Sequence, residues 1–194
     1  MKDFYVFRHG ETSYNVSGHI QGHSNDSRLT ANGKLQARAA GHKLKSKNIE
    51  IIFSSPLDRA VETGRIIAGI IGAPLQTDER LIEVNVGIAE GMHYLEAEKQ
   101  FADLYRRWRS TDLQYADTRF EGGETKNEVR ARVFEALNFY AEETPYHRIA
   151  VSAHGITLTL ILQALQVQRY DIPNCTIVHL THNNKHWQFV EYLN

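Results

Sequence analysis

The strongest constraint on the fold is that short buried strands alternate with longer helical segments along the chain. Three runs predict such strands, at residues 4–7 (FYVF), 49–53 (IEIIF) and 148–153 (RIAVSA). Strands that alternate with helices are typical of an α/β domain with a largely parallel sheet. We therefore predict a three-layer α/β/α sandwich around a mostly parallel mixed sheet.

The helical segments carry recognisable start and stop signals. Thr30 suits the start of a helix that fades near residues 46–48. The residues expected on the buried side of this helix are Leu35, Ala39 and Leu44. Pro56 suits the first position of a second helix, which ends at Gly72. Thr125 and Glu128 form a capping box that opens a third helix, reaching to about residue 143.

Residues 79–124 interrupt the alternation. Residues 94–109 have apolar and aromatic side chains at roughly helical spacing, with loop-like sequence on both sides. We interpret 79–124 as a small helical insertion over the active site of a single domain spanning 1–194. A short strand near 75–77, a helix from 155 to about 165 and strands at 176–182 and 186–193 complete the predicted elements.

Composition and charge exclude several classes of protein. Hydrophobic residues make up 42% of the 194 residues and the formal net charge is −1, as in an ordinary soluble globular protein. No overall field attracts nucleic acid or a membrane surface, so neither is an expected partner. Cys175 is the single cysteine, and we see neither a secretory signal nor a membrane-spanning run. A cytoplasmic protein is therefore expected.

Polar side chains follow the predicted strands at the points where they end. Arg8 and His9 follow the first strand, residues 54–59 with Arg59 follow the second, and His154 follows the third. In parallel sheets, ligands bind at the carboxyl ends of strands. We therefore expect these side chains to converge on one rim.

Two arginines and two histidines on one rim would make a site for a phosphate dianion. The arginine fork matches phosphate oxygens, and the helix starts after Pro56 and Gly155 add backbone donors. A neutral imidazole can attack phosphorus, and a carboxyl group must then protonate the leaving oxygen. Glu83 is the best-placed carboxyl group, with Glu11 and Glu124 as rivals.

The blocks that carry these residues resemble those of a known family. They are RHGETSYN (8–15), IQG (20–22), DSRLTANGKLQA (26–37), SSPLDRAVET (54–63), RLIE (80–83), GGET (122–125) and SAHG (152–155). In this order they resemble the histidine phosphatase superfamily, also called the phosphoglycerate mutase-like family. The resemblance covers nearly the whole chain. Arg28, where the family usually has proline, and Gly64, where it usually has alanine, depart from the pattern.

The resemblance implies a role for each matching residue. His9 would be the phosphorylated nucleophile, and Glu83 the proton donor. Arg8, Arg59 and His154 would hold the phosphoryl group. The residues expected to contact substrate are Thr12, Asn15, Gln21 and Gly155. The resemblance implies neither a metal nor another cofactor.

Other sequence features have simpler explanations than a second function. His179, His182 and His186 could suggest a metal site, but residues three apart on a strand face opposite sides, so we expect exposed strand and turn histidines. The run RRWR (106–109) is interpreted as a solvated helix face with a buried Trp108. The sequence contains no G-x-S-x-G elbow, so a serine hydrolase is not expected. The GGET turn lacks the preceding strand and the further glycines of a dinucleotide-binding fingerprint.

The predicted function is hydrolysis of a small phosphate monoester through a phosphohistidine. A mutase shares the first half-reaction but returns the phosphoryl group to a second hydroxyl and excludes water. The insertion is short and offers chiefly Arg106, Arg107 and Arg109 as cations, which favours the phosphatase. An inactive module that binds a phosphorylated ligand is a third hypothesis. The physiological substrate and a homodimer are left open.

Overall fold

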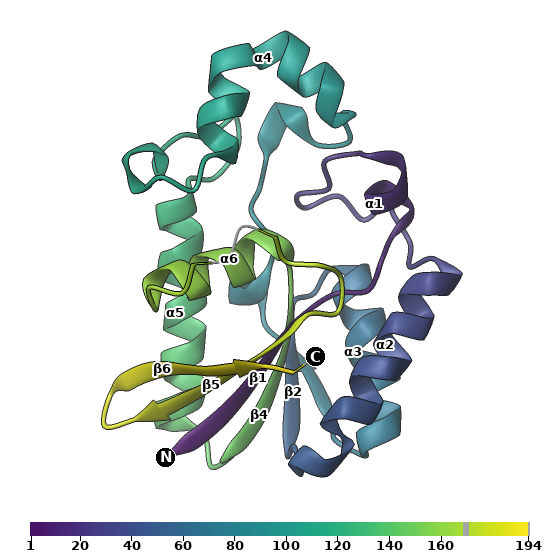
Figure 1. Ribbon diagram of the computed structural model, residues 1–194, viewed down its shortest axis with the longest axis vertical. Helices are drawn as coiled ribbons and strands as arrows, with labels where there is room; N and C mark the ends of the chain where they lie inside the picture. The colour runs from purple at the N-terminus through teal and green to yellow at the C-terminus, as the bar shows by residue number, and fades with distance from the viewer. Residues whose placement is uncertain (169–170, 194) are drawn as a thin grey trace.

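The computed structural model describes residues 1–168 and 171–193 of the chain, and its described strands form one six-stranded mixed sheet (Figure 1). The strand order is β3-β2-β4-β1-β5-β6. The strands are β1 (Lys2–Arg8), β2 (Ile51–Ser54), β3 (Leu75–Thr77), β4 (Arg148–Ala153), β5 (Ile177–Asn183) and β6 (His186–Tyr192). The pairs β3–β2, β2–β4 and β4–β1 are parallel, whereas β1–β5 and β5–β6 are antiparallel. The predicted mixed, mostly parallel sheet is confirmed.

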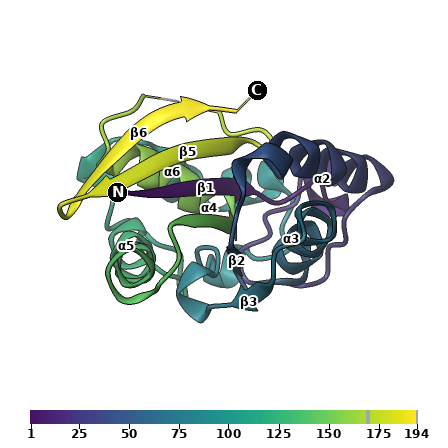
Figure 2. The same ribbon diagram turned by 90° about the horizontal axis from the view of Figure 1, so that it is seen from below.

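Helices cover both faces of the sheet, which confirms the three-layer architecture. The α-helices are α1 (Ser13–Ser17), α2 (Ala31–Leu44), α3 (Asp58–Ile71), α4 (Tyr94–Arg109), α5 (Lys126–Glu143) and α6 (Gly155–Ala164). Short 3₁₀ turns are η1 (Lys45–Lys47), η2 (Glu79–Leu81), η3 (Gly87–Ala89) and η4 (Leu113–Tyr115). Helices α2 and α3 lie on one face, and α5 and α6 lie on the other (Figure 2).

The central strand β1 shows how the sheet is buried on both faces. Phe4 and Val6 belong to the apolar cluster that includes residues of α5 and α6. Tyr5 and Phe7 alternate with them and belong to the cluster that includes residues of α2 and α3. Because successive side chains of a strand point to opposite faces, an unbroken apolar run is what such a central strand requires.

Helix α2 corrects the predicted buried side of the first long helix. Leu35 is 64% exposed and Ala39 is also exposed, so both predictions were wrong, whereas Leu44 is buried as expected. The helix instead turns its small residues inward, including Gly33, Ala37, Ala40 and Gly41. A side chain at Gly41 would come within 2.7 Å of Ile70 Cδ1 on α3, so α2 packs on α3 through close backbone approach.

Helix α3 begins at Asp58, two residues later than the predicted start at Pro56. Its N-cap residue Leu57 has an extended backbone, and Gly72 closes the helix in the left-handed conformation, as expected. Helix α5 begins as predicted, because Thr125 and Glu128 form the reciprocal capping box. Its residues Val133, Leu137 and Tyr140 are buried.

The segment between β3 and α5 carries α4 beyond the carboxyl ends of the strands, above the end of β1 (Figure 1). Trp108 of this helix is buried, as expected, and packs against Phe120 with ring centroids 5.3 Å apart. This arrangement confirms a small helical insertion over the predicted site. Within the described residues, no helix is both long enough and apolar enough to cross a membrane.

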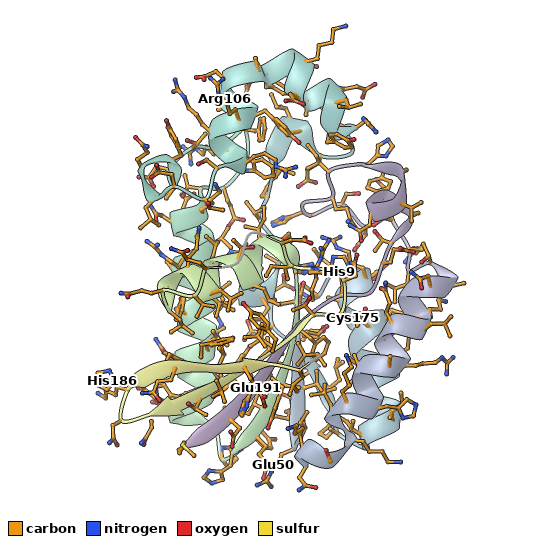
Figure 3. All side chains as sticks on the ribbon, viewed as in Figure 1. His9, Glu50, Arg106, Cys175, His186 and Glu191 are labelled. Carbon is orange, nitrogen blue, oxygen red and sulfur yellow. The ribbon has the colours of Figure 1, made fainter. Side chains whose placement is uncertain are left out.

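The three histidines that could have suggested a metal site lie in the C-terminal hairpin of β5 and β6. His179 bonds to Asp3 Oδ1 through Nε2 at 2.8 Å and stacks on Tyr5. His182 is only 6% exposed and lies against Trp187, so the expectation that it is exposed was wrong. His186 lies near the tip of the hairpin (Figure 3). In the described parts of the chain, no group of three or more histidine, cysteine or acidic side chains is arranged to hold a metal.

Candidate active site

His9 directly follows β1 and lies between the sheet and α4 (Figure 3). Its side chain is buried, with 3% exposed. Its backbone N–H donates to Ala153 O of β4 at 3.0 Å, and the Asn174 amide donates to its carbonyl. Its Nδ1 lies 2.7 Å from Gly10 O. Since a carbonyl only accepts, Nδ1 carries the hydrogen and Nε2 keeps its lone pair.

The environment of His9 keeps its imidazole neutral. Burial lowers the pKa of His9 well below its ordinary value, and the charges of Arg59 and Arg8 lower it further. A neutral imidazole with a defined tautomer has its Nε2 lone pair available at neutral pH. His9 therefore has the protonation state that a nucleophile requires.

Position 10 requires glycine because the chain after His9 passes very close to the start of α2. A side chain at Gly10 would place its Cβ 2.5 Å from Gly33 O. In the same way, a Cβ on Gly33 would lie 2.1 Å from Glu11 O. The Gly10 N–H donates to Thr63 Oγ1 of α3 at 3.0 Å, which fixes the loop. The two glycines thus set the position of the chain just beyond His9.

Two arginines flank His9. Arg59 is 1% exposed, and it donates to Gly22 O and Ser24 O at 2.6 and 2.8 Å. Arg8 donates to Ile172 O at 2.5 Å. Burial lowers the pKa of Arg59 to about 10, so it remains a cation at neutral pH. Within the described residues, the buried Nε atom of neither arginine has a hydrogen-bond partner.

His154 lies at the end of β4, beside His9. Its Nε2 is 2.7 Å from Ser55 Oγ, and the Leu57 N–H donates to the same hydroxyl oxygen. The hydroxyl hydrogen is therefore available to donate to Nε2, which leaves the ring hydrogen on Nδ1. Among the described residues this buried Nδ1 has no partner. His154 is fully buried and does not line the cavity, so its contact with a phosphoryl group stays a prediction.

A cavity of about 350 Å³ opens over His9. Arg8, Arg59 and Glu83 also line it. Buried polar groups normally have partners, so two partnerless arginine Nε donors beside one cavity point to an anionic ligand. Aromatic and aliphatic side chains from α1, α4, α6 and the segments 20–22 and 84–86 form much of the remaining wall, together with polar residues that include His19, Arg109 and Asp171. The apolar and aromatic residues include Tyr14, Ile20, Val84, Val86, Tyr94, Tyr105, Trp108 and Ile156.

Glu83 reaches this cavity from the segment before α4 and lies at the start of α6. Its Oε2 accepts from Ile156 N–H at 3.1 Å, and its Oε1 accepts from Thr157 N–H at 3.3 Å. The Thr157 hydroxyl and the Val84 N–H complete the set of donors. Glu83 is only 8% exposed, and the helix terminus fixes the orientation of its carboxyl group.

The rival carboxylates are engaged elsewhere, and neither lines the cavity. Glu11 accepts from Thr30 Oγ1 and Asn32 Nδ2 at the start of α2. Glu124 forms an ion pair with Arg132 at 2.9 Å and accepts from the Asn85 N–H. This geometry favours Glu83 as the proton donor.

The predicted substrate contacts divide into two groups. Asn15, Gln21 and Gly155 line the cavity, whereas Thr12 does not. Thr12 is fully buried and caps α1, and its hydroxyl bonds to Asn15 Oδ1 and Gln21 Oε1. Direct contact of Thr12 with a substrate therefore stays a prediction. Its geometry instead suits a residue that positions Asn15 and Gln21.

Arg132 of α5 is a positioning residue that the sequence did not reveal. Its guanidinium donates to the carbonyls of Arg80, Ile82 and Glu83 and to the Glu124 carboxylate. It therefore ties the Glu83 segment to α5 and to the GGET turn. In the sequence, Arg132 occupies a helical position that an ordinary surface arginine could also occupy. No sequence signal therefore indicated this contact.

Comparisons with known proteins show which family the sequence resembles. The sequence profile of the histidine phosphatase superfamily (branch 1) matches residues 4–194. Probable phosphoglycerate mutase GpmB of Salmonella choleraesuis (strain SC-B67) is 34% identical over 193 residues, covering 96% of this chain and 88% of the relative.

Two solved structures share the fold at low sequence identity. A mycobacterial glucosyl-3-phosphoglycerate phosphatase has a TM-score of 0.83 at 24% identity, over 97% of each chain. A phosphoglycerate mutase from Bacillus anthracis str. Sterne has a TM-score of 0.88 at 20% identity, over 97% of this chain and 91% of that chain. Because a phosphatase and a mutase both share the fold, the fold alone does not separate the two activities. The profile match and the Salmonella relative, taken with the site, show that this chain belongs to the histidine phosphatase superfamily.

Proposed function

We propose that the protein hydrolyses a small phosphate monoester through a phosphohistidine on His9. The observation that carries this proposal is the neutral His9 imidazole, which lines one cavity with Arg8 and Arg59 and whose Nδ1 is bound by Gly10 O. The Nε donors of both arginines lack partners among the described residues. A phosphoryl group would satisfy these donors while its phosphorus faces the nucleophile.

The reaction would proceed in two steps. Nε2 of His9 attacks phosphorus, the bond to the leaving oxygen breaks, and Glu83 gives that oxygen a proton. Water then attacks phosphorus and passes a proton back to Glu83. The phosphorus–nitrogen bond breaks and inorganic phosphate leaves. The arginines offset charge on the phosphoryl oxygens throughout, which is the main requirement of phosphoryl transfer.

The cavity walls favour hydrolysis over a mutase reaction. Of the three arginines near the end of α4, only Arg109 lines the cavity over His9. Arg106 and Arg107 form ion pairs with Asp103 instead. A mutase must hold its intermediate away from water and return the phosphoryl group to a second hydroxyl. The cavity over His9 is open to solvent, which suits water as the acceptor.

A mutase is the second candidate, and the Salmonella relative, named a probable phosphoglycerate mutase, favours it. The two activities share every residue of the first step and differ only in the acceptor. We disfavour an inactive binding module because the proposed nucleophile His9, the cations Arg8 and Arg59 and the carboxyl group of Glu83 all line one cavity. We expect a cytoplasmic enzyme without nucleic-acid or membrane partners, and a homodimer is left open.

The test is a hydrolysis screen over para-nitrophenyl phosphate and a panel of phosphorylated metabolites, with a mutase assay on 3-phosphoglycerate in parallel. We expect release of inorganic phosphate, unchanged by EDTA because Arg8 and Arg59 supply the cations. The proposed hydrolase activity would be contradicted if the rate of phosphoglycerate interconversion exceeded the rate of phosphate release from every substrate tested. Loss of activity in EDTA, restored by a divalent metal, would contradict the metal-independent mechanism.

A further inference from the structure

The segment 172–176 leads into β5 and contacts the end of β1 on the side opposite β4. Ile172 O accepts a hydrogen bond from Arg8 Nη1 at 2.5 Å, and Thr176 O accepts from the Arg8 N–H at 3.1 Å. The segment therefore holds both the side chain and the backbone of the residue that precedes His9.

Residues 173–176 of this segment form a turn, because the Thr176 N–H donates to Pro173 O at 3.1 Å. Cys175 lies beside His9 in this turn, and its N–H donates to His9 O at 3.3 Å (Figure 3). Its φ of 56° falls in the left-handed region that favours glycine. Another residue type keeps this conformation only where surrounding contacts hold it, so the turn has a fixed position against His9.

The side chain of Asn174 projects from the same turn and makes two hydrogen bonds. Its Nδ2 donates to His9 O at 3.0 Å and to Asn15 Oδ1 at 3.1 Å. Both partners are oxygens that only accept, and the two hydrogens of one amide nitrogen can serve both of them. Asn174 thus links the end of β1 to a side chain of α1.

The surrounding donors fix the orientation of the Asn15 amide. The Thr12 N–H, which can only donate, bonds to Asn15 Oδ1 at 3.1 Å. Because the oxygen faces Thr12 and Asn174, Nδ2 is the end of the amide that is left for the cavity, which Asn15 lines. The Thr12 hydroxyl also lies 3.1 Å from Asn15 Oδ1, but it lies 3.0 Å from Gln21 Oε1 and has one hydrogen for both. Thr12 belongs to the same loop as Asn15, whereas Asn174 ties the amide to the sheet.

We propose that Asn174 is a positioning residue for phosphoryl transfer and that it acts through Asn15. Asn174 holds the Asn15 amide so that Nδ2 donates to an oxygen of the phosphoryl group while that group passes to His9 Nε2. An amide whose oxygen faced the cavity would repel the phosphate dianion, so its orientation decides whether Asn15 helps or hinders the reaction. The inference rests on the proposed phosphohistidine chemistry and adds to it a residue from the segment before β5.

The test is a double-mutant cycle on the rate of phosphoenzyme formation, measured by rapid quenching with ³²P-labelled para-nitrophenyl phosphate and with a labelled alkyl phosphate. Asn174→Ala should slow this step about tenfold with both substrates, as expected for loss of about one hydrogen bond to the phosphoryl group. Asn15→Ala should slow it at least as much. Adding Asn174→Ala to Asn15→Ala should then slow the step by less than about twofold, because the amide through which Asn174 acts is already gone.

Two further variants make the cycle decisive. Asn138→Ala, exposed on α5, removes an amide that accepts from Trp187 Nε1, and this matched control should leave the rate unchanged. Asn174→Asp keeps the shape of the side chain but turns a carboxylate oxygen towards two acceptors. It should slow the step at least as much as Asn174→Ala, and it replaces that variant if the alanine protein does not fold.

Several results would overturn the inference while leaving the phosphohistidine chemistry intact. They are an unchanged rate in the folded Asn174 variants or in Asn15→Ala, an equal loss in Asn138→Ala, and a loss confined to the alkyl phosphate. A tenfold effect of Asn174→Ala that persists in the Asn15→Ala protein would also overturn it, because Asn174 would then act by another route. Absence of a phosphoenzyme in the wild type would overturn the proposed function, and the inference with it.

Discussion

The imidazole rings of His9 and His154 lie edge to face, with centroids 5.4 Å apart and an interplanar angle of 60°. They follow the adjacent parallel strands β1 and β4, whose carboxyl ends meet at one rim of the sheet. Gly10 O fixes the tautomer of His9, and Ser55 orients the ring of His154. The pairing of the two strands thus brings the proposed nucleophile, His9, beside the buried imidazole of His154.

Replacing Glu83 with glutamine should affect poor leaving groups far more than good ones. An alkyl phosphate leaves as a strongly basic alkoxide that needs a proton, whereas nitrophenolate needs little help. We expect Glu83→Gln to slow phosphorylation by alkyl phosphates by about a hundred- to ten-thousandfold. Pre-steady-state bursts should show a much smaller effect with para-nitrophenyl phosphate. Glu124→Gln is the control, and leaving-group dependence in that variant alone would show that the acid has been misassigned.

Replacing Arg132 should also slow alkyl phosphates more than para-nitrophenyl phosphate, but less strongly than Glu83→Gln does. The reason is that the Arg132 guanidinium donates to the backbone carbonyl of Glu83 and so helps to position this residue. A displacement near 1 Å can reduce rates by about a hundredfold, so we expect Arg132→Met to lower kcat for alkyl phosphates by about ten- to a hundredfold. The rate with para-nitrophenyl phosphate should fall less. Arg130→Met, on the same helix, serves as the control. An equal loss on both substrate types would indicate a merely structural role.

The buried histidines should make the fold sensitive to acid. Burial lowers the pKa values of both His9 and His154 well below 6.5. Below pH 6.5 these two histidines are therefore protonated in the unfolded chain but stay neutral in the folded chain. The free energy of unfolding consequently falls as the pH falls. Each ring should contribute about 1.4 kcal/mol per pH unit once its unfolded form is protonated.

Urea unfolding at pH 7 and pH 5 measures this loss of stability. His154→Gln removes one of the two rings and should lose less stability over the interval than the wild type. His42→Gln, which changes an exposed histidine of α2, should behave as the wild type does. Equal losses in the wild type and His154→Gln would contradict the assignment of a buried neutral ring.

The close contact between Gly33 and the chain after His9 should be intolerant of any side chain. A Cβ at Gly33 would meet backbone atoms of Glu11, which cannot move aside as a flexible side chain can. We expect Gly33→Ala to destabilise the fold by about 1–3 kcal/mol. Gly69→Ala in α3 is the matched control, since a Cβ there meets nothing within 4 Å. It should stabilise the helix by about 0.5–1 kcal/mol, and a similar result at Gly33 would contradict the close packing.

The features that sequence reasoning predicted are those determined by local rules. Strand and helix signals each span a few residues, and the carboxyl ends of parallel strands necessarily share a rim. These two rules are sufficient to place Arg8, His9 and His154 together. Arg59 follows from the turn after the second strand.

The features that were missed depend on tertiary packing. Leu35 fits a helical apolar pattern, but α2 packs through glycine and alanine because its backbone approaches α3 closely. The sequence also gives no sign that the Thr12 hydroxyl caps α1 and bonds to Asn15 and Gln21. Arg132 reaches the Glu83 segment from 49 residues away along the chain. Periodicity and spacing contain no information about such contacts.

The most direct test of the central claim is to trap the phosphoenzyme. Rapid quenching after mixing with ³²P-labelled para-nitrophenyl phosphate should yield protein-bound phosphate that is acid-labile and base-stable, as phosphohistidine is, and peptide mapping should place it on His9. His9→Ala should show no label and no turnover with its fold intact, whereas His42→Ala should label as the wild type does. Normal turnover in His9→Ala, or label on another residue, would contradict the account.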